Sequence, residues 1–183
     1  LETVLRDTPQ SSGDAKGAIV KETLNIPVSA NYALRINALY SYKEPGMTYV
    51  GRPKPGARFD LNNKTFSIKG KYLLEASDAL SIYVIADYNK STGVAGVFDR
   101  PYSNVAAGSV NAPALAADGI TPSVDNFKFG GETGYYRDLK TGGAQARVAY
   151  TLGSGVEISN LLAWRFYKID QQYDIDNLTA DGA

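Results

Sequence analysis

Cysteine and histidine are both absent from the 183 residues of this chain. Without them the chain has no thiol nucleophile, no Ser-His-Asp arrangement, and none of the nitrogen or sulfur ligands on which zinc sites usually depend. Charge of one sign is also missing, because 19 basic residues balance 19 acidic residues. A chain with no net charge creates no field that attracts a polyanion, so nucleic acid is not an expected partner.

Long hydrophobic runs are missing as well, and no apolar stretch approaches the roughly 20 residues that a spanning helix requires. Methionine and tryptophan each occur once, whereas there are 13 tyrosines and 18 glycines. This composition favours a β-rich chain with many turns, and no segment has convincing helical periodicity. Strands that cross a membrane contain no apolar run, and their signal is an alternation of apolar and polar residues.

Alternation with a period of two residues recurs along the chain. Between residues 32 and 43 the even-numbered positions are apolar, while Arg35, Asn37 and Ser41 lie on the opposite face. The pattern predicts strands at residues 16–26, 32–43, 64–74, 80–90, 144–152 and 156–168. Glu22 and Asn160 interrupt it, because they place polar side chains on the apolar faces of the first and last of these strands. Each has about the 9 to 11 residues that cross a bilayer at a tilt.

The connections alternate between short turns and long loops. Residues 26–31, 75–79 and 153–155 form short turns, whereas residues 44–62, residues 91–142 and the segment after Asp170 form long loops. Antiparallel strands place all the long loops at one end, as in outer-membrane barrels, whose long loops lie outside the cell.

Aromatic residues occupy both ends of the predicted apolar face. Amphipathic rings prefer the two interfaces of a bilayer, so two belts are typical of a membrane wall. The long-loop end has Tyr40, Tyr42, Phe66, Tyr88, Trp164 and Phe166, and the turn end has Tyr32, Tyr72 and Tyr150.

Three segments resemble a known family. In LNIPVSANYALRINALYSYKEPG, residues 24–46, a strand ends in a Pro-containing turn and the next strand opens with an Ala-x-Arg core. This segment resembles the barrel domain of TonB-dependent outer-membrane receptors. FDLNNKTFSIKGKYLLEASDALSIYVIADYNKS and GGAQARVAYTLGSGVEISNLLAWRFYKID look like the following hairpins of that domain, so the resemblance covers about residues 16–176. The resemblance implies the architecture of that family, a barrel of about 22 strands that is plugged by an N-terminal globular domain. The resemblance implies import of a scarce nutrient, with energy coupled from the inner membrane and no bond chemistry.

Neither a plug nor an energy-coupling box is visible in this sequence. We therefore expect an all-β fold, an antiparallel up-and-down segment of about six strands from a larger transmembrane β-barrel in the outer membrane, with long extracellular loops. Residues 1–15 are expected as a lead-in segment from a preceding loop or strand, residues 16–170 as barrel wall, and residues 171–183 as the start of a further extracellular loop. The expected partners are the lipid bilayer, a nutrient of the siderophore-iron or glycan class, the rest of the barrel and plug, and an inner-membrane energy-coupling protein.

Two groups of side chains are candidates for binding. Long loops carry recognition residues in many scaffolds, and aromatic and Arg side chains can stack on sugars or hold carboxylates. The loop candidates for substrate contacts are Tyr49, Arg58, Phe59, Arg100, Tyr102, Phe127, Phe129, Tyr135, Tyr136 and Arg137. The polar face of the strands is expected to line the lumen, where it can hydrate a channel, contact a plug or guide a charged substrate. Its members are Arg35, Lys69, Lys71, Asp87, Gln145, Arg147 and Arg165.

The carboxylates and glycines predict no catalytic or metal site. Asp174, Asp176 and Asn177 supply too few oxygens for calcium, and Asp118 and Asp125 have no fixed separation on rigid elements. The glycine pairs at 130–131 and 142–143 lack the spacing of phosphate-binding loops and are interpreted as turn or loop residues. No enzyme activity, metal or cofactor is expected.

Two other interpretations fit the same alternation. A self-contained outer-membrane barrel of about eight strands, acting as an anchor or adhesin, needs two further strands, near residues 3–6 and within residues 127–136. A soluble β-sandwich acting as a binding module uses the apolar face as an ordinary core and buries Trp164.

Overall fold

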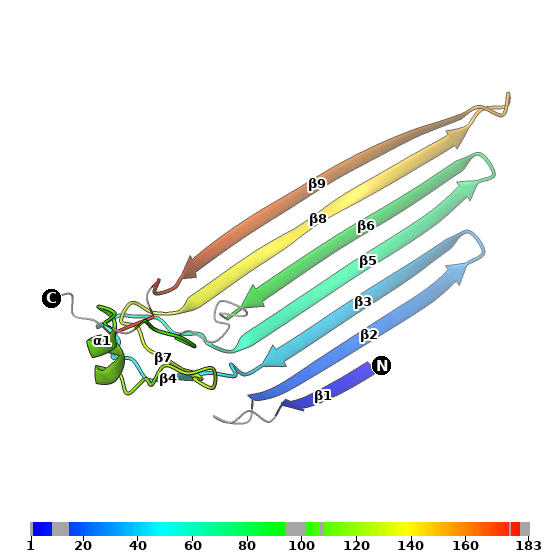
Figure 1. Cartoon of the computed structure of the whole chain (residues 1–183). Helices are drawn as coiled ribbons and strands as arrows, with labels where there is room; N and C mark the ends of the chain where they lie inside the picture. Colours follow the sequence, from blue (N-terminus) through cyan, green and yellow to red (C-terminus); the bar gives the residue numbers. More distant parts are fainter. Residues whose placement is uncertain (1, 9–14, 94–101, 107, 176, 180–183) are drawn as a thin grey trace.

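The computed structural model describes residues 2–8, 15–93, 102–106, 108–175 and 177–179. It confirms an all-β chain, in which seven antiparallel strands form one sheet in the order of the sequence (Figure 1). Strand β1 occupies the segment that was expected as a lead-in. The strands of the sheet are β1 (Glu2–Thr8), β2 (Ala15–Ser29), β3 (Tyr32–Lys43), β5 (Asn63–Ser77), β6 (Leu80–Thr92), β8 (Tyr136–Thr151) and β9 (Glu157–Gln172).

Short and long connections lie at opposite ends of the sheet, as the alternation predicts (Figure 1). Hairpin turns join β2 to β3, β5 to β6 and β8 to β9. The long segments at the other end contain the helix α1 (Ala112–Ala117) and two short strands, β4 (Thr48–Tyr49) and β7 (Lys128–Phe129), which pair in parallel. In the part of the chain that the structure describes, no helix is long and apolar enough to cross a membrane.

Strand pairing aligns the apolar residues of all the strands from β2 to β9. Because successive side chains point to opposite sides of a sheet, residues in one row across the strands share a face. One row consists of Ile26, Leu34, Tyr72, Val84, Ala146 and Leu162, and the adjacent row consists of Asn25, Arg35, Lys71, Ile85, Gln145 and Ala163. We call the side of the first row the apolar face and the side of the second row the polar face.

Strand β8 begins at Tyr136, well before the residue 144 at which the alternation predicts it. The interpretation of Gly142 and Gly143 as loop residues is wrong, because both lie inside β8. Glycine normally weakens a strand, but here neighbouring side chains use the space it leaves. A Cβ on Gly143 would lie 2.3 Å from the Trp164 carbonyl oxygen, and one on Gly142 would lie 2.8 Å from Cε1 of Phe166.

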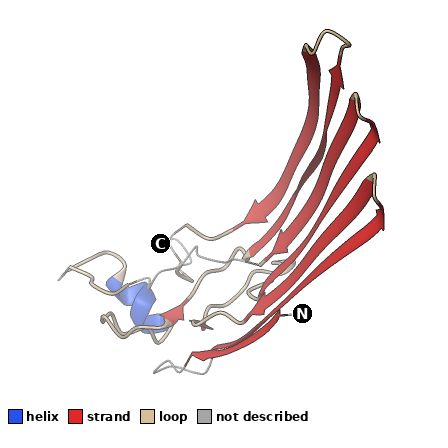
Figure 2. Ribbon diagram, turned by 90° about the vertical axis from the view of Figure 1, so that its right-hand side faces the viewer, coloured by secondary structure: helices blue, strands red, loops and turns tan. Residues whose placement is uncertain are grey.

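The sheet is a single curved layer (Figure 2). From β2 to β9 its buried residues are Gly142 and Gly143, and every described side chain is partly or fully exposed. On the apolar face Leu162 is 69% exposed and Trp164 is 63% exposed. The apolar face of a soluble sandwich is covered by a second layer. The sandwich interpretation, with Trp164 in a core, is therefore wrong for the described residues.

The described sheet is open at both edges. Strands β1 and β9 are the edge strands, and within the described residues β9 pairs only with β8. Of the two further strands that a self-contained barrel needs, β1 is present. Residues 127–136 supply only the two-residue strand β7, which pairs with β4 outside the sheet, and the first residue of β8. The described residues alone therefore form no closed barrel.

Candidate functional site

The long connections pack together at one end of the sheet (Figures 1 and 2). We call the described residues within 44–62, 102–135 and 173–179 the loop cap. Backbone hydrogen bonds join its first two segments, since the Thr48 amide donates to the Phe127 carbonyl oxygen at 2.7 Å and the Val50 amide donates to that of Phe129 at 2.9 Å. The loop cap is therefore an ordered unit with its own backbone pairing.

Four aromatic side chains from separate parts of the chain form one core of the loop cap. The rings of Phe129 and Tyr135 are 5.2 Å apart with planes at 88°, and the Tyr49 ring is 4.8 Å from Phe59. Edge-to-face and tilted contacts of this kind stabilise aromatic clusters beyond the area that they bury. Phe129 is 1% exposed and Tyr135 is 0% exposed. The structure thus brings four expected substrate contacts together, but it gives Phe129 and Tyr135 no surface for a ligand.

The tyrosine hydroxyls of this core hold the glycine segment beside it. The Tyr49 hydroxyl donates to the Gly131 carbonyl oxygen at 2.7 Å, and the Tyr135 hydroxyl oxygen lies 2.8 Å from the Gly130 carbonyl oxygen. Gly131 has a φ of +122°, and a Cβ there would lie 2.3 Å from the Tyr135 hydroxyl oxygen, so the position requires glycine. Burial is the largest of the causes that raise the pKa of the Tyr49 hydroxyl above its ordinary value of 10.0.

The described residues after β9 are hydrogen-bonded to the part of the loop cap around Gly130 and Thr133. Oδ2 of Asp174 accepts hydrogen bonds from the Glu132 amide at 2.9 Å, the Thr133 amide at 3.3 Å and the Thr133 hydroxyl at 3.2 Å. The carbonyl oxygen of Asn177 accepts from the Gly130 amide at 2.9 Å. Asp174 and Asn177, which sequence reasoning weighed as calcium ligands, therefore hold loops together.

Asp118 is the second buried carboxylate of the loop cap. Its side chain is 0% exposed, and Oδ1 lies 3.8 Å from Nη2 of Arg52. Oδ2 accepts a hydrogen bond from the Thr179 amide at 2.8 Å, which ties the end of α1 to the segment after β9. Among the described residues Oδ1 has no hydrogen-bond partner, and no group of three possible metal ligands includes Asp118 or Asp174. Asp176 lies outside the described residues.

Three other candidates form contacts where the loop cap meets the sheet. The guanidinium carbon of Arg58 lies 4.2 Å from the centre of the Tyr136 ring, a cation–π geometry, and Arg58 is exposed. The Tyr136 hydroxyl donates to Oδ1 of Asp170 at 3.1 Å. Arg137 donates from Nη2 to the Ser91 hydroxyl oxygen at 3.2 Å. Tyr136 and Arg137 were expected in a loop and lie instead at the start of β8.

The remaining loop candidates lie apart from these contacts. Tyr102 is half-buried, has a left-handed φ of 61° and packs against the cluster of Leu115 and Ile120. Phe127 is half-buried. Arg100 lies outside the described residues.

Strand pairing places all the side chains that were expected to face a lumen on the polar face: Arg35, Lys69, Lys71, Asp87, Gln145, Arg147 and Arg165. The two terminal nitrogens of Arg165 cross Gly143 and each donate to one carboxylate oxygen of Asp87 at 2.9 Å. Arg147 donates to Oε1 of Glu157 at 2.9 Å. The glycine pair of β8 therefore makes room for an ion pair on this face as well as for a ring on the other.

Basic side chains dominate the polar face although the whole chain is neutral. The charged residues of this face from β2 to β9 are the basic residues Lys21, Arg35, Lys43, Lys69, Lys71, Arg137, Arg147 and Arg165 and the acidic residues Glu75, Asp87 and Glu157. Glu75 and Glu157 both lie near the hairpin turns. The middle of the face thus has a positive potential that attracts anions.

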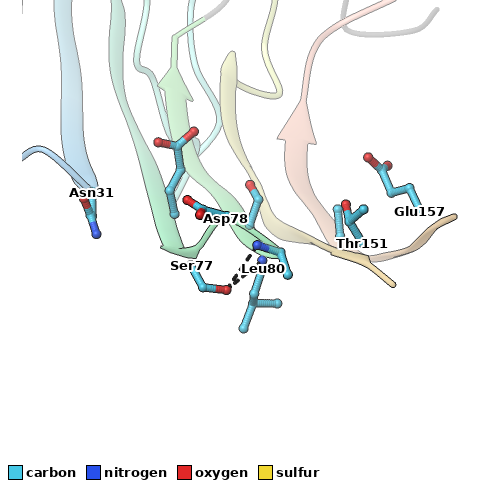
Figure 3. Close-up of a pocket in the computed structure, with 10 residues that line it drawn as sticks. Asn31, Ser77, Asp78, Leu80, Thr151 and Glu157 are labelled. Carbon is cyan, nitrogen blue, oxygen red and sulfur yellow. Dashed lines mark hydrogen bonds between the residues drawn. The ribbon is translucent and has the colours of Figure 1, made fainter. Parts of the chain in front are cut away.

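Two hollows lie near the turn end of the polar face. One, of about 450 Å³, has Arg35, Lys71 and Tyr83 among its lining residues. The other, of about 400 Å³, lies beside the hairpin turns, where Asn31, Asp78, Thr151 and Glu157 surround it (Figure 3). In the second hollow the hydroxyl oxygen of Ser77 accepts from the amides of Ala79 and Leu80 at 3.2 and 3.1 Å. That hydroxyl therefore stabilises the turn.

A row of lysines ends the apolar face at its loop end. Lys90, Lys140 and Lys168 lie directly opposite one another on β6, β8 and β9, two residues beyond Tyr88, Gly142 and Phe166 respectively. Lys64 ends the same face on β5, two residues beyond Phe66. Sequence reasoning missed this row because it treated Lys64, Lys90 and Lys168 as strand ends and placed Lys140 in the loop of residues 91–142. A lysine two residues beyond the last aromatic residue nevertheless recurs in three of the strands.

Comparison with known proteins gives no relative for this chain, since no family model, no curated protein and no solved structure matches it.

Proposed function

We propose that this chain forms part of the wall of an outer-membrane receptor that binds a scarce nutrient outside the cell and imports it. The observation that carries the proposal is the apolar face, which is continuous over the strands from β2 to β9 and covered by no described residue. Monomeric soluble proteins rarely expose contiguous apolar patches of more than a few hundred Å². Such a face is stable in contact with the hydrocarbon of a bilayer, and the polar face is stable in contact with water.

The height of the apolar face fits a bilayer. On β9 the apolar positions run from Ile158 to Phe166, with Val156 at the turn just before them. The ten residue steps from Val156 to Phe166, at about 3.3 Å each, span about 33 Å along the strand, and a strand tilt of about 40° reduces this to a height of about 25 Å. That height equals the apolar band of outer-membrane barrels, which is about 25 Å tall. Asn160 is the polar interruption of this band on β9, as the sequence predicts.

The boundaries of the band support the same placement. At the loop end, the aromatic side chains of Tyr88 and Phe166 are followed by the lysine row of Lys90, Lys140 and Lys168. Lysines at a membrane interface extend their charged ends into water while their stems stay on apolar surface. The strands continue past the lysine row into the loop cap, which would therefore stand outside the bilayer.

The loop cap and the polar face support a receptor over a simple anchor. The loop cap is an ordered structure of three chain segments, and it carries the exposed Arg58 stacked on Tyr136. The polar face carries charge that a passing solute would meet. Nutrient uptake, a plug, further barrel strands that pair with β1 and β9, and an energy-coupling partner in the inner membrane follow from the resemblance to TonB-dependent receptors. The nutrient class that the resemblance suggests is a siderophore-iron complex or a glycan.

Trp164 tests the membrane placement, because it is the only tryptophan of the chain and lies on the apolar face. In bilayers containing lipids brominated along their acyl chains, its fluorescence should be strongly quenched. The matched control is the double variant W164F/Y167W, which moves the single tryptophan to the polar face at a position where Tyr167 is 65% exposed. That variant should resist brominated lipid and respond to acrylamide in water. Equal quenching of the two proteins by brominated lipid would contradict the proposal.

Nutrient uptake requires a separate measurement in cells. Deletion of the gene that encodes this chain should slow growth when iron is available only as a siderophore complex, or when a glycan is the only carbon source. Restoring the gene should restore growth. Unchanged growth under both conditions would count against the receptor assignment while leaving the membrane placement intact.

A further inference from the structure

We propose that the hollow beside Arg35 and Lys71 binds a small organic anion with an apolar or aromatic body. The proposal deepens the proposed function by naming a ligand class for the polar face, and it rests on that function for placing the hollow inside a pore. Arg35 on β3 and Lys71 on β5 lie directly opposite each other in the strand register. Like charges directly opposite each other on neighbouring strands are destabilising, and a bound anion would relieve this repulsion.

The described structure offers Arg35 and Lys71 no carboxylate partner. Neither Arg35, Lys71 nor the neighbouring Lys69 forms an ion pair with any described residue. Asp87, which lies directly opposite Lys69, has both of its oxygens bound by Arg165 at 2.9 Å. The nearest acid of the same face is thus already neutralised, and the positive charge of the group is left for a ligand.

The shape of the hollow defines the rest of the ligand. Its volume is about 450 Å³, and beside Arg35 and Lys71 its walls include the side chains of Pro27, Leu73 and Tyr83. A pocket with apolar walls and a few charged groups at its edge selects an apolar body and fixes its charged end. Arg binds a carboxylate through two parallel hydrogen bonds, and Lys adds a second charge. Benzoate-like carboxylates have this combination of a ring and a charged end.

The position of the hollow gives it a defined place in transport. Arg35 is the second polar-face residue of β3 from its hairpin turn, and it lies with Lys71 towards the end of the sheet opposite to the loop cap. In the proposed receptor the hollow would therefore hold an anion that has already passed the loop cap.

The probe for this site is 4-fluorobenzoate, whose binding to the full chain in dodecyl maltoside micelles can be followed by fluorine NMR. The neutral analogue 4-fluorobenzamide has the same ring and separates charge recognition from general apolar binding, and empty micelles give the background. We expect the chain to bind the benzoate more tightly than the amide. In R35Q/K71Q the dissociation constant for the benzoate should rise by about tenfold or more, since charge-assisted hydrogen bonds are lost.

Two further variants control for charge and folding. K43Q removes a charge from the same face and strand as Arg35, but eight residues away, about 26 Å along β3, so benzoate binding should not change. R35K/K71R keeps both charges and should retain binding even if R35Q/K71Q folds poorly. The proposal is overturned if benzoate and benzamide bind alike, or if K43Q weakens binding as much as R35Q/K71Q.

These outcomes are independent of the Trp164 measurement. Charge-dependent binding together with an unquenched Trp164 would support the anion site and contradict the membrane wall. A quenched Trp164 without charge-dependent binding would support the membrane wall and contradict the anion site.

Discussion

Replacing Phe129 by alanine should open the loop cap without affecting the sheet. Phe129 is 1% exposed and contacts the rings of Tyr49 and Tyr135 at centroid distances of 5.5 and 5.2 Å. Truncating a buried phenylalanine costs about 3 to 5 kcal/mol, from the lost transfer free energy and the cavity that remains. Because the loop cap has its own core, this cost should appear as an increase in local opening.

Hydrogen exchange measures that opening directly. The Thr48 and Val50 amides, which donate to the Phe127 and Phe129 carbonyl oxygens, report on the cap, and amides of the β5–β6 ladder report on the sheet. A cost of about 3 to 5 kcal/mol corresponds to exchange faster by roughly 2 to 4 orders of magnitude at the cap amides. The matched control is V110A, at a position that is 91% exposed, where exchange should not change. Acceleration of less than about tenfold, or equal acceleration in the sheet, would refute the assignment of the cap as a separately packed unit.

Two other substitutions test β8 and the pH response of the loop cap. Gly143→Val should destabilise the sheet by about 1 to 3 kcal/mol, because the added Cβ meets the Trp164 carbonyl oxygen. The measurement is the melting temperature in detergent, which should fall. Gly153→Ala is the control and should change the melting temperature little, because open space surrounds Gly153. Because the folded cap raises the pKa of Tyr49, the contribution of the protonated Tyr49 hydroxyl to cap stability is fully present below pH 10.0. That contribution is lost as the pH rises from there through the raised pKa. Tyr49→Phe should therefore reduce the loss of cap protection between neutral and alkaline pH, and an unchanged loss would contradict this role for Tyr49.

The faces of the strands could be predicted from the sequence because a period of two residues encodes them directly. Leu34 and Tyr72 were assigned to apolar faces on separate strands, and the pairing places them directly opposite each other. Tyr88 and Phe166 were assigned to the same end of the apolar face, and the pairing places them in one row. The start of β8 could not be predicted, since Gly142 and Gly143 interrupt the alternation. Their role depends on Trp164, Arg165 and Phe166 of the neighbouring strand, which the local sequence of β8 does not contain.

The loop cap could be predicted only as a set of residue types. Aromatic and Arg residues in the long loops were correctly located in loops for the most part, but whether a ring packs inside or faces solvent depends on contacts between distant segments. Tyr49 and Tyr135 meet across 86 positions of the chain numbering, and no periodicity links them. Arg58 is exposed and stacks on Tyr136, which begins β8 and does not belong to the core of the cap.

The hydrogen bonds of Asp174, Asn177 and Thr179 couple the parts of the loop cap mechanically. Asp174 holds the segment of Glu132 and Thr133, while Thr179 is bonded through its amide to Asp118 and through its hydroxyl to the amide of Arg52. A force applied to one of the three segments is therefore transmitted to the other two through these hydrogen bonds. A molecule that displaces any of the three segments therefore changes the packing of the whole loop cap at once.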